Sequence, residues 1–322
     1  MFWFSEASSP CNLIMIPAIL ATILFCLSAV TANRATRLIG SVEANFWRLV
    51  LSVACLAIWA HGFGQGLRGT AFGVFFLSGV IGFGIGDVAL YLAYPRLGSR
   101  LTLLLVHCLA APVAAVGEWL ILGTVLTGPE MLAGGCILLG VGIALAPGEN
   151  PHISSRDLVV GGFFGVLGAA GQGLGAVLSR VGYGMNATDG IVVDGMSVAY
   201  QRILGGLLIG FVSYSWVRAR TIPKRSKGPD GLSGAWAWIG MPSGNVWRWI
   251  VGTAMAGPVI GVTCFQWALE GAKSGVVLPI VATAPLVVMP LSLWMEGDRP
   301  GIRAVLGGVL AVIGVIGLSV VL

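Results

Sequence analysis

Long apolar runs separated by short polar breaks fill almost the whole chain. Each run holds about 20 mainly apolar residues, the length that an α-helix needs to cross the hydrocarbon core of a bilayer. A transmembrane β-barrel would instead show short segments of alternating polarity, and these runs do not have that pattern. The runs therefore predict an all-α integral membrane protein with ten transmembrane helices. They lie near residues 13–32, 41–62, 70–94, 98–122, 129–147, 157–180, 192–217, 249–269, 273–295 and 302–322.

The composition favours lipid as the surrounding solvent. Hydrophobic residues make up 57% of the 322 residues and charged residues only 10%, against roughly 25% charged residues in an average soluble domain. Glycine is abundant, with 49 residues, as expected where helices approach each other through small side chains. The first run is too long for the core of a signal peptide, so we expect a retained helix. The six cysteines form no CxxC pair and are expected to be small core residues.

The second half of the chain repeats the pattern of the first. The segment GSRLTLLLVHCLAAP begins at Gly98, and GAKSGVVLPIVATAP begins at Gly271, an offset of 173 residues. Both segments carry a cation two residues after the glycine, and both end in Ala-Pro. The repeat divides the chain into five-helix units over 1–150 and 151–322, with a long polar loop at 218–248. Because five is an odd number, the second unit enters the membrane from the opposite side, which predicts two inverted repeats.

These repeated segments resemble the EamA-type repeats of the drug/metabolite transporter superfamily. The resemblance rests on a proline that kinks the fourth helix of each unit and on an arginine early in each second helix. These residues are Pro112 and Pro285, and Arg48 and Arg202. Glu296 fills the acidic position of the family in the second unit, but the first unit has Gly123 and Thr124 there. The resemblance implies a carrier that exports amino acids, other metabolites or drugs, usually driven by protons, while relatives exchange nucleotide sugars.

The run at 98–122 carries a polar stripe. Arg100, His107 and Glu118 lie 7 and 11 residues apart, which places them along one helix face. His107 is about nine residues into the helix, roughly 13 Å deep at 1.5 Å per residue. Ionisable residues inside a span are costly to bury, so the stripe is a candidate relay for protons or substrate. Alternatively, Arg100 and Glu118 lie at the two interfaces and His107 bonds a neighbouring backbone carbonyl.

The run at 70–94 offers a second polar face. Asp87, Tyr91 and Tyr94 occupy positions i, i+4 and i+7, so an aspartate lies beside two phenols on one side of a helix. Such a face can bind an ammonium group or a proton. The alternative is an interhelical hydrogen bond from Asp87, with Arg48 as its candidate partner.

Other polar and aromatic residues also lie within the runs. Arg48 and Arg202 are candidates for binding a substrate carboxylate, and the alternatives are structural ion pairs or extension to the interface. Gln172, Gln266 and Trp267 are candidates for lining the pocket from the second unit, and the alternative is helix packing.

The sequence carries no motif for a soluble cofactor. The glycine clusters GFGIGD and GQGLGA do not fit GxGxxG, and no GxxxxGK[ST] occurs. Both clusters are therefore expected to serve helix packing. His107 is a lone histidine among the runs and does not form a metal-ligand cluster. We expect no cofactor, no metal and no catalytic residue. Transport is then coupled to an ion gradient, coupled to exchange, or not coupled at all.

Basic residues are distributed unevenly between the two ends of the helices. The formal net charge is +5, and 13 of the 18 Lys and Arg residues lie on the side of the 218–248 loop, against three on the other side. The positive-inside rule then places both termini outside the cytoplasm, whereas the family resemblance implies termini inside. The loop sequence RARTIPKRSK is expected to attract anionic lipid headgroups rather than nucleic acid.

Two functions are compatible with the sequence. The first is a multi-pass efflux carrier of the plasma membrane, working by alternating access, whose partners are a small-molecule substrate, membrane lipids and protons. The second is a membrane-embedded enzyme or lipid-handling protein that uses Asp87, His107 and Glu118. A metal-dependent enzyme would need clustered His, Asp and Glu ligands, which the lone His107 does not provide. The inverted repeat disfavours a third possibility, a scaffold without transport. The sequence leaves open whether the protein forms a homodimer.

Overall fold

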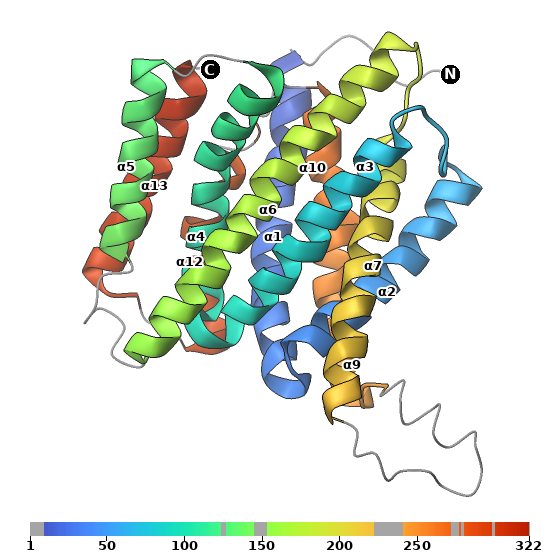
Figure 1. The fold of residues 1–322 in the computed structure, drawn as a ribbon. Helices are drawn as coiled ribbons and strands as arrows, with labels where there is room; N and C mark the ends of the chain where they lie inside the picture. Colours follow the sequence, from blue (N-terminus) through green and yellow to red (C-terminus); the bar gives the residue numbers. More distant parts are fainter. Residues whose placement is uncertain are drawn as a thin grey trace, which may run out of the picture.

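The computed structural model describes residues 10–123, 127–144, 153–221, 241–271, 277, 280–297 and 300–321. Across these residues the chain is helical and contains no strand, and the helices lie side by side in one bundle (Figure 1). Its α-helices and two π-helical segments are α1 (Pro10–Ile39), α2 (Ser41–Gly62), α3 (Phe72–Gly79), η1 (Val80–Gly86), α4 (Asp87–Leu122), α5 (Gly128–Ala144), α6 (Ser155–Thr188), α7 (Gly195–Thr221), α9 (Gly244–Ala254), η2 (Met255–Val259), α10 (Ile260–Gly271), α12 (Ala284–Glu296) and α13 (Ile302–Val321).

Within the described ranges, six helical stretches are long and apolar enough to cross a membrane. Each predicted apolar run overlaps at least one described helix. The prediction of an all-helical membrane protein is therefore confirmed. Residues 222–240, which form most of the predicted polar loop, lie outside the described part of the chain.

The predicted runs at 70–94 and 98–122 follow each other without a loop. α3, η1 and α4 form one helical stretch that is interrupted at Gly98, whose φ is 76° and ψ is 173°. Glycine adopts a positive φ at little cost because it has no Cβ. The chain changes direction between η1 and the later turns of α4 (Figure 1). Gly98 thus separates the two predicted helices.

The two matched prolines occupy different positions in their helices. Pro112 lies inside α4, where it removes one backbone hydrogen bond of the helix. Pro285 lies in the first turn of α12, directly after a turn at 282–283. A proline is tolerated in the first turn because the backbone N–H is not used there. The helical course is therefore broken before Pro285, whereas it continues through Pro112.

The two glycine clusters meet where η1 and α6 cross. A Cβ built on Gly171 would lie only 2.5 Å from the Cα of Gly86, and one on Gly86 would lie 3.1 Å from the Cα of Gly171. Any larger residue at either position would push the helices apart. The prediction that GFGIGD and GQGLGA serve helix packing is confirmed at this crossing.

The helices of the two halves are interleaved. α5 packs on α13, and α2 packs on α7. α1 packs on α9, η2, α10 and α12 of the second half, and α6 packs on α3, η1 and α4 of the first half. Buried side chains from both halves therefore form a common interior.

Candidate functional site

A cavity of about 60 Å³ lies between the two halves. α1, α2, η1 and α4 border it from the first half, and α6, η2 and α10 border it from the second half. Both π-helical segments thus contribute to its wall, and such segments are frequent at functional sites. The lining residues are Phe25, Ser28, Arg48, Phe83, Asp87, Leu90, Tyr91, Tyr94, Leu103, Val106, His107, Gln172, Gly257, Pro258 and Val262.

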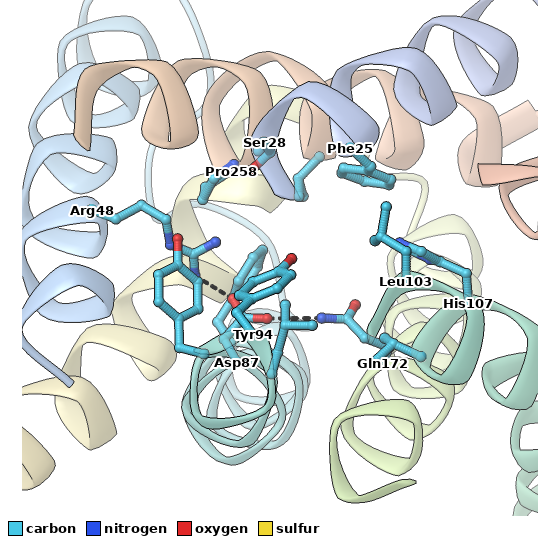
Figure 2. Close-up of a pocket in the computed structure, with 15 residues that line it drawn as sticks. Phe25, Ser28, Arg48, Asp87, Tyr94, Leu103, His107, Gln172 and Pro258 are labelled. Carbon is cyan, nitrogen blue, oxygen red and sulfur yellow. Dashed lines mark hydrogen bonds and ion pairs between the residues drawn. The ribbon is translucent and has the colours of Figure 1, made fainter. Parts of the chain in front are cut away.

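An ion pair between Arg48 and Asp87 forms one wall of the cavity. Arg48 Nη2 donates to Asp87 Oδ2 and also to Asn45 Oδ1, at 2.9 Å from the latter. Gln172 Nε2 donates to the other carboxylate oxygen, Asp87 Oδ1, at 3.0 Å. Figure 2 shows this chain from Arg48 through Asp87 to Gln172 across the cavity. Asp87 is 2% exposed and Arg48 is 4% exposed, so each charge depends on its partner.

This pair is the interhelical contact that the sequence offered as the alternative role of Asp87. It joins α2 to the start of α4, and Gln172 adds α6 of the second half. A carboxylate that accepts hydrogen bonds from both halves can respond to their relative movement.

The two predicted phenols lie beside the ion pair. The guanidinium of Arg48 lies 4.8 Å from the centroid of the Tyr91 ring, a distance at which the ring face attracts the cation. Tyr91 shares a hydrogen bond of 2.9 Å with Thr253 Oγ1. Ser28 Oγ donates to the backbone oxygen of Thr253 at 3.1 Å. Tyr94 packs edge-to-face on Tyr91, with ring centroids 5.6 Å apart.

His107 lies on the opposite side of the cavity from Arg48 (Figure 2). Its ring stacks on Phe25 of α1, with centroids 5.7 Å apart and planes 13° from parallel. His107 also lines a second, smaller cavity of about 30 Å³. The two cavities share Phe25, Phe83, His107, Gln172 and Val262 as a common wall.

Arg202 lines the second cavity. It lies on α7 and is 3% exposed. Its guanidinium lies 5.2 Å from the centroid of the Phe83 ring. The other residues around this cavity are Ala110, Phe265 and Val281.

Glu118 lies apart from both cavities, although the stripe on the 98–122 run placed it on the same face as His107. It accepts a hydrogen bond from Arg180 Nη1 and pairs α4 with α6. The 11 residues between His107 and Glu118 correspond to roughly 16 Å along a helix, so Glu118 meets a different neighbour. Arg100 is buried but lines neither cavity. Only His107 of the predicted stripe therefore reaches the cavities.

Gln266 and Trp267 also lie outside the cavity walls. Trp267 is 51% exposed, whereas Gln266 is fully buried within the bundle. The two residues are adjacent on α10, so they point to different sides of it. Of the three predicted lining residues of the second unit, Gln172 borders the cavities.

Glu296 joins three helices at the end of the bundle where Gly98 lies. Its Oε1 accepts from Asn33 Nδ2 at 2.9 Å, and its Oε2 accepts from Ser99 Oγ at 2.9 Å. These bonds hold α12 to α1 and α4. Glu296 borders a polar hollow of about 300 Å³ together with Arg37 and Asp157.

Sequence reasoning did not single out Ser28, Asn45, Thr253, Phe25 and Phe83. The sequence gives a weak indication for Asn45, because it precedes Arg48 by three residues and so lies next to it on one helix face. Hydroxyl side chains in helices often bond their own backbone, so Ser28 and Thr253 carry no distinguishing signal. Among the described residues, no three His, Cys, Asp or Glu side chains gather as a metal site. Cys26, Cys108 and Cys264 are buried and free, as expected of core residues.

The comparisons with known proteins concern the second half most directly. Residues 231–320 match the family model described as the EamA-like transporter family. None of the curated proteins matches the chain significantly. Among solved structures, 27 chains match. One of them, described only as the crystal structure of a protein, is 15% identical, has a TM-score of 0.63, and is matched over 96% of this chain and 97% of its own length.

At this level of identity the structural likeness shows a shared fold alone. The family match is more informative than the structural likeness, because it is a match in sequence. It covers the repeated segment that begins at Gly271 together with α12 and α13. Of the residues on which the resemblance in the sequence rested, Pro285 and Glu296 lie within the match. The match confirms that resemblance over residues 231–320, which are similar to the EamA-like transporter family, a part of the drug/metabolite transporter superfamily.

Proposed function

We propose that the protein is a secondary carrier that exports small metabolites across the plasma membrane by alternating access. The observation that carries this proposal is a cavity whose polar wall comes from both halves of the chain. Arg48 and Asp87 belong to residues 1–150, and Gln172 belongs to residues 151–322. A site between two units can open to either side when the units rock against each other.

The two halves are proposed to be inverted five-helix repeats. The exchange of helix contacts supports this, since α1 and α6 each pack on the third and fourth helices of the opposite half. The π-helical segments support it too, because η1 holds Gly84 and η2 holds Gly257, which are 173 residues apart. Superposition of residues 1–150 on 151–322 about an axis in the membrane plane tests this. A second part of α4 that fails to overlay α12 would contradict it.

Asp87 and His107 are proposed to exchange the coupling proton. Both are ionisable, and both border the central cavity. A proton on Asp87 would remove the negative charge that holds Arg48, so the pair could open when the cavity changes its accessible side. Transport would then depend on the proton gradient.

The orientation of the carrier is a separate part of the proposal. The charge asymmetry favours a cytoplasmic position for Lys224 and Lys227, which lie outside the described residues. Single cysteines introduced there, in a background without reactive thiols, should resist a membrane-impermeant reagent in intact cells. Ready labelling would support the opposite orientation.

Purified protein in liposomes tests the carrier proposal. A panel of radiolabelled amino acids, organic acids and amines is offered with and without a pH gradient, and we expect saturable uptake of at least one class. Protein-free liposomes provide the background. Uptake of no compound, together with turnover of an added lipid, would support a membrane-embedded enzyme instead.

Two variants then test proton coupling. Asp87→Asn and His107→Ala should each abolish uphill transport, while counterflow per folded molecule survives better because it needs no net proton movement. His61→Ala is the matched control, since His61 lines neither cavity and bonds Tyr200 at 3.2 Å. Normal uphill transport by both cavity variants would exclude this coupling mechanism.

A further inference from the structure

The two buried arginines of the cavity region differ in their counter-charge. Arg48 is held by Asp87 and Asn45. Arg202 makes no ion pair within the described part of the chain. The Nε atoms of both arginines lack a hydrogen-bond partner there, so the difference lies in the carboxylate. The residue that corresponds to Asp87 at the offset of 173 is Ile260, which is apolar and 40% exposed. The second half therefore keeps the arginine without its acid.

The surroundings of Arg202 are shaped to admit its guanidinium. A Cβ on Gly82 and a Cβ on Gly175 would each lie 3.3 Å from Arg202 Nη2, so these glycines leave room for it between η1 and α6. The ring of Phe83 lies beneath the cation. Asp87 acts on this guanidinium electrostatically, but both carboxylate oxygens of Asp87 accept from Arg48 and Gln172. Of the five N–H donors of Arg202, the one on Nε has no acceptor among the described residues.

The charge around the second cavity is unbalanced. Among the described residues that line it, none is acidic, and Arg202 is its permanent cation. Asp87 lies on the wall of the neighbouring cavity, where Arg48 and Gln172 already occupy it. A buried charge without a partner is costly. A ligand that brings a negative charge to Arg202 would remove this cost.

We propose that Arg202 binds the carboxylate of the transported compound, so that the substrates are small organic monocarboxylates with a short apolar or aromatic body. This inference rests on the proposed function and names the substrate class of the same site. A guanidinium and a carboxylate form two parallel hydrogen bonds. Phe25, Phe83 and Phe265 supply apolar walls for the rest of the molecule. The cavities of about 60 and 30 Å³ are together smaller than an aromatic acid, so binding of such a body requires the site to widen, as rocking of the two halves would allow.

Matched small molecules test this class on the wild-type protein. The probes are phenylacetate, its neutral analogue phenylacetamide and its cationic counterpart phenethylamine, each at rising concentration in a thermal-shift measurement. We expect saturable stabilisation by phenylacetate alone. Butyrate and laurate extend the test, because a small soluble acid and a membrane fatty acid share the same headgroup. Stronger binding of laurate would assign the site to a lipid-derived acid.

An arginine variant tests the residue. Arg202→Met should weaken phenylacetate binding by at least about tenfold, the order expected for hydrogen bonds to a charged group. Arg218→Met is the matched control, because Arg218 lies in the last turn of the same helix and pairs with Glu43. If Arg202→Met does not fold, Arg202→Lys is the alternative. It keeps the positive charge but loses the planar guanidinium that forms two parallel hydrogen bonds, so it should bind phenylacetate more weakly than the wild type.

The outcomes separate this inference from the proposed function. Saturable uptake of amines, with no binding of carboxylates, would overturn the inference and leave the carrier in place. Carboxylate binding without transport of any compound would contradict the carrier alone. Unchanged phenylacetate affinity in a folded Arg202→Met would show that the acid binds elsewhere.

Discussion

Arg48 and Arg202 occupy comparable places in the two halves of the chain and have different electrostatic surroundings. Each lies on the second helix of its half, and each approaches a glycine of a π-helical segment. Arg48 Nη1 would lie 3.7 Å from a Cβ on Gly257 of η2, and Arg202 Nη2 would lie 3.3 Å from a Cβ on Gly82 of η1. Yet Arg48 has a carboxylate partner, whereas Arg202 faces phenylalanine and valine side chains.

The difference shows how one pattern can serve two purposes. Around Arg48, the charge is compensated within the protein, and removal of either partner leaves the other buried. Around Arg202, the charge is compensated only in part, by a ring face and by Asp87, which is already paired with Arg48. The first arrangement stabilises the interior, and the second leaves a cation available to a ligand. Substitutions at Arg48 and at Arg202 should therefore differ in the sign as well as the size of their effect on stability.

The largest expected effect is the loss of the acid beside Arg48. Asp87→Leu replaces the carboxylate by a branched apolar side chain, which is larger than that of aspartate, and leaves Arg48 buried without its carboxylate. Removal of one partner of a buried pair costs about 3–5 kcal/mol, so thermal melting of the purified protein should fall sharply. The double variant Asp87→Leu with Arg48→Met should recover part of this loss. A melting temperature unchanged in Asp87→Leu would mean that the pair contributes no net stability.

A smaller loss is expected for the amide that joins the second half to this pair. Gln172→Leu removes the 3.0 Å hydrogen bond to Asp87 Oδ1. A hydrogen bond to a charged group contributes about 1.5–3 kcal/mol, and the Arg48 contact remains in place. In combination with Asp87→Leu, the Gln172 substitution should cost less than alone, since the two residues interact directly. Strict additivity in this double-mutant cycle would rule out that contact.

Much of the fold could be predicted from apolar runs. The run at 41–62 coincides with α2, and the break between 94 and 98 coincides with the interruption at Gly98. α1 continues to Ile39, beyond the predicted end at 32, because Arg34 and Arg37 are compatible with a helix although they end the apolar run. The π-helical segments were not predicted, since their hydrogen-bond pattern depends on how η1 and η2 pack on other helices.

The site could be predicted only where its residues share one helix. Asp87, Tyr91 and Tyr94 were found together because their spacing places them on one face of α4. The partner of Glu118 was not found, because Arg180 lies on another helix and no spacing relates the two. Trp267 shares its helix with Gln266, but an aromatic residue inside a span is equally compatible with an exposed position, which it occupies.

A modest loss is expected for the phenol beside Arg48. Tyr91→Phe removes the 2.9 Å hydrogen bond to Thr253 Oγ1 and retains the ring beneath the guanidinium. A neutral hydrogen bond contributes about 1 kcal/mol. Thr253 keeps its contact with Ser28 Oγ at 3.1 Å, which limits the cost further. The melting temperature should fall slightly. A decrease as large as that of Asp87→Leu would show that the hydroxyl supports the ion pair itself.

The smallest effect on stability, and the one that separates the two arginines most clearly, is expected for Arg202. Arg202→Met removes a buried cation that has no acidic side chain among the described residues of its cavity, and it loses the contact with Phe83. The first change favours the folded protein, and the second opposes it by about 1–2 kcal/mol. We therefore expect thermal melting of the ligand-free variant within a few degrees of the wild type, or above it. Arg48→Met provides the comparison on the other half, and it should melt well below the wild type because Asp87 then stays buried without its cation. Equal losses in the two variants would show that Arg202 is compensated as completely as Arg48, and the distinction between the halves would not hold.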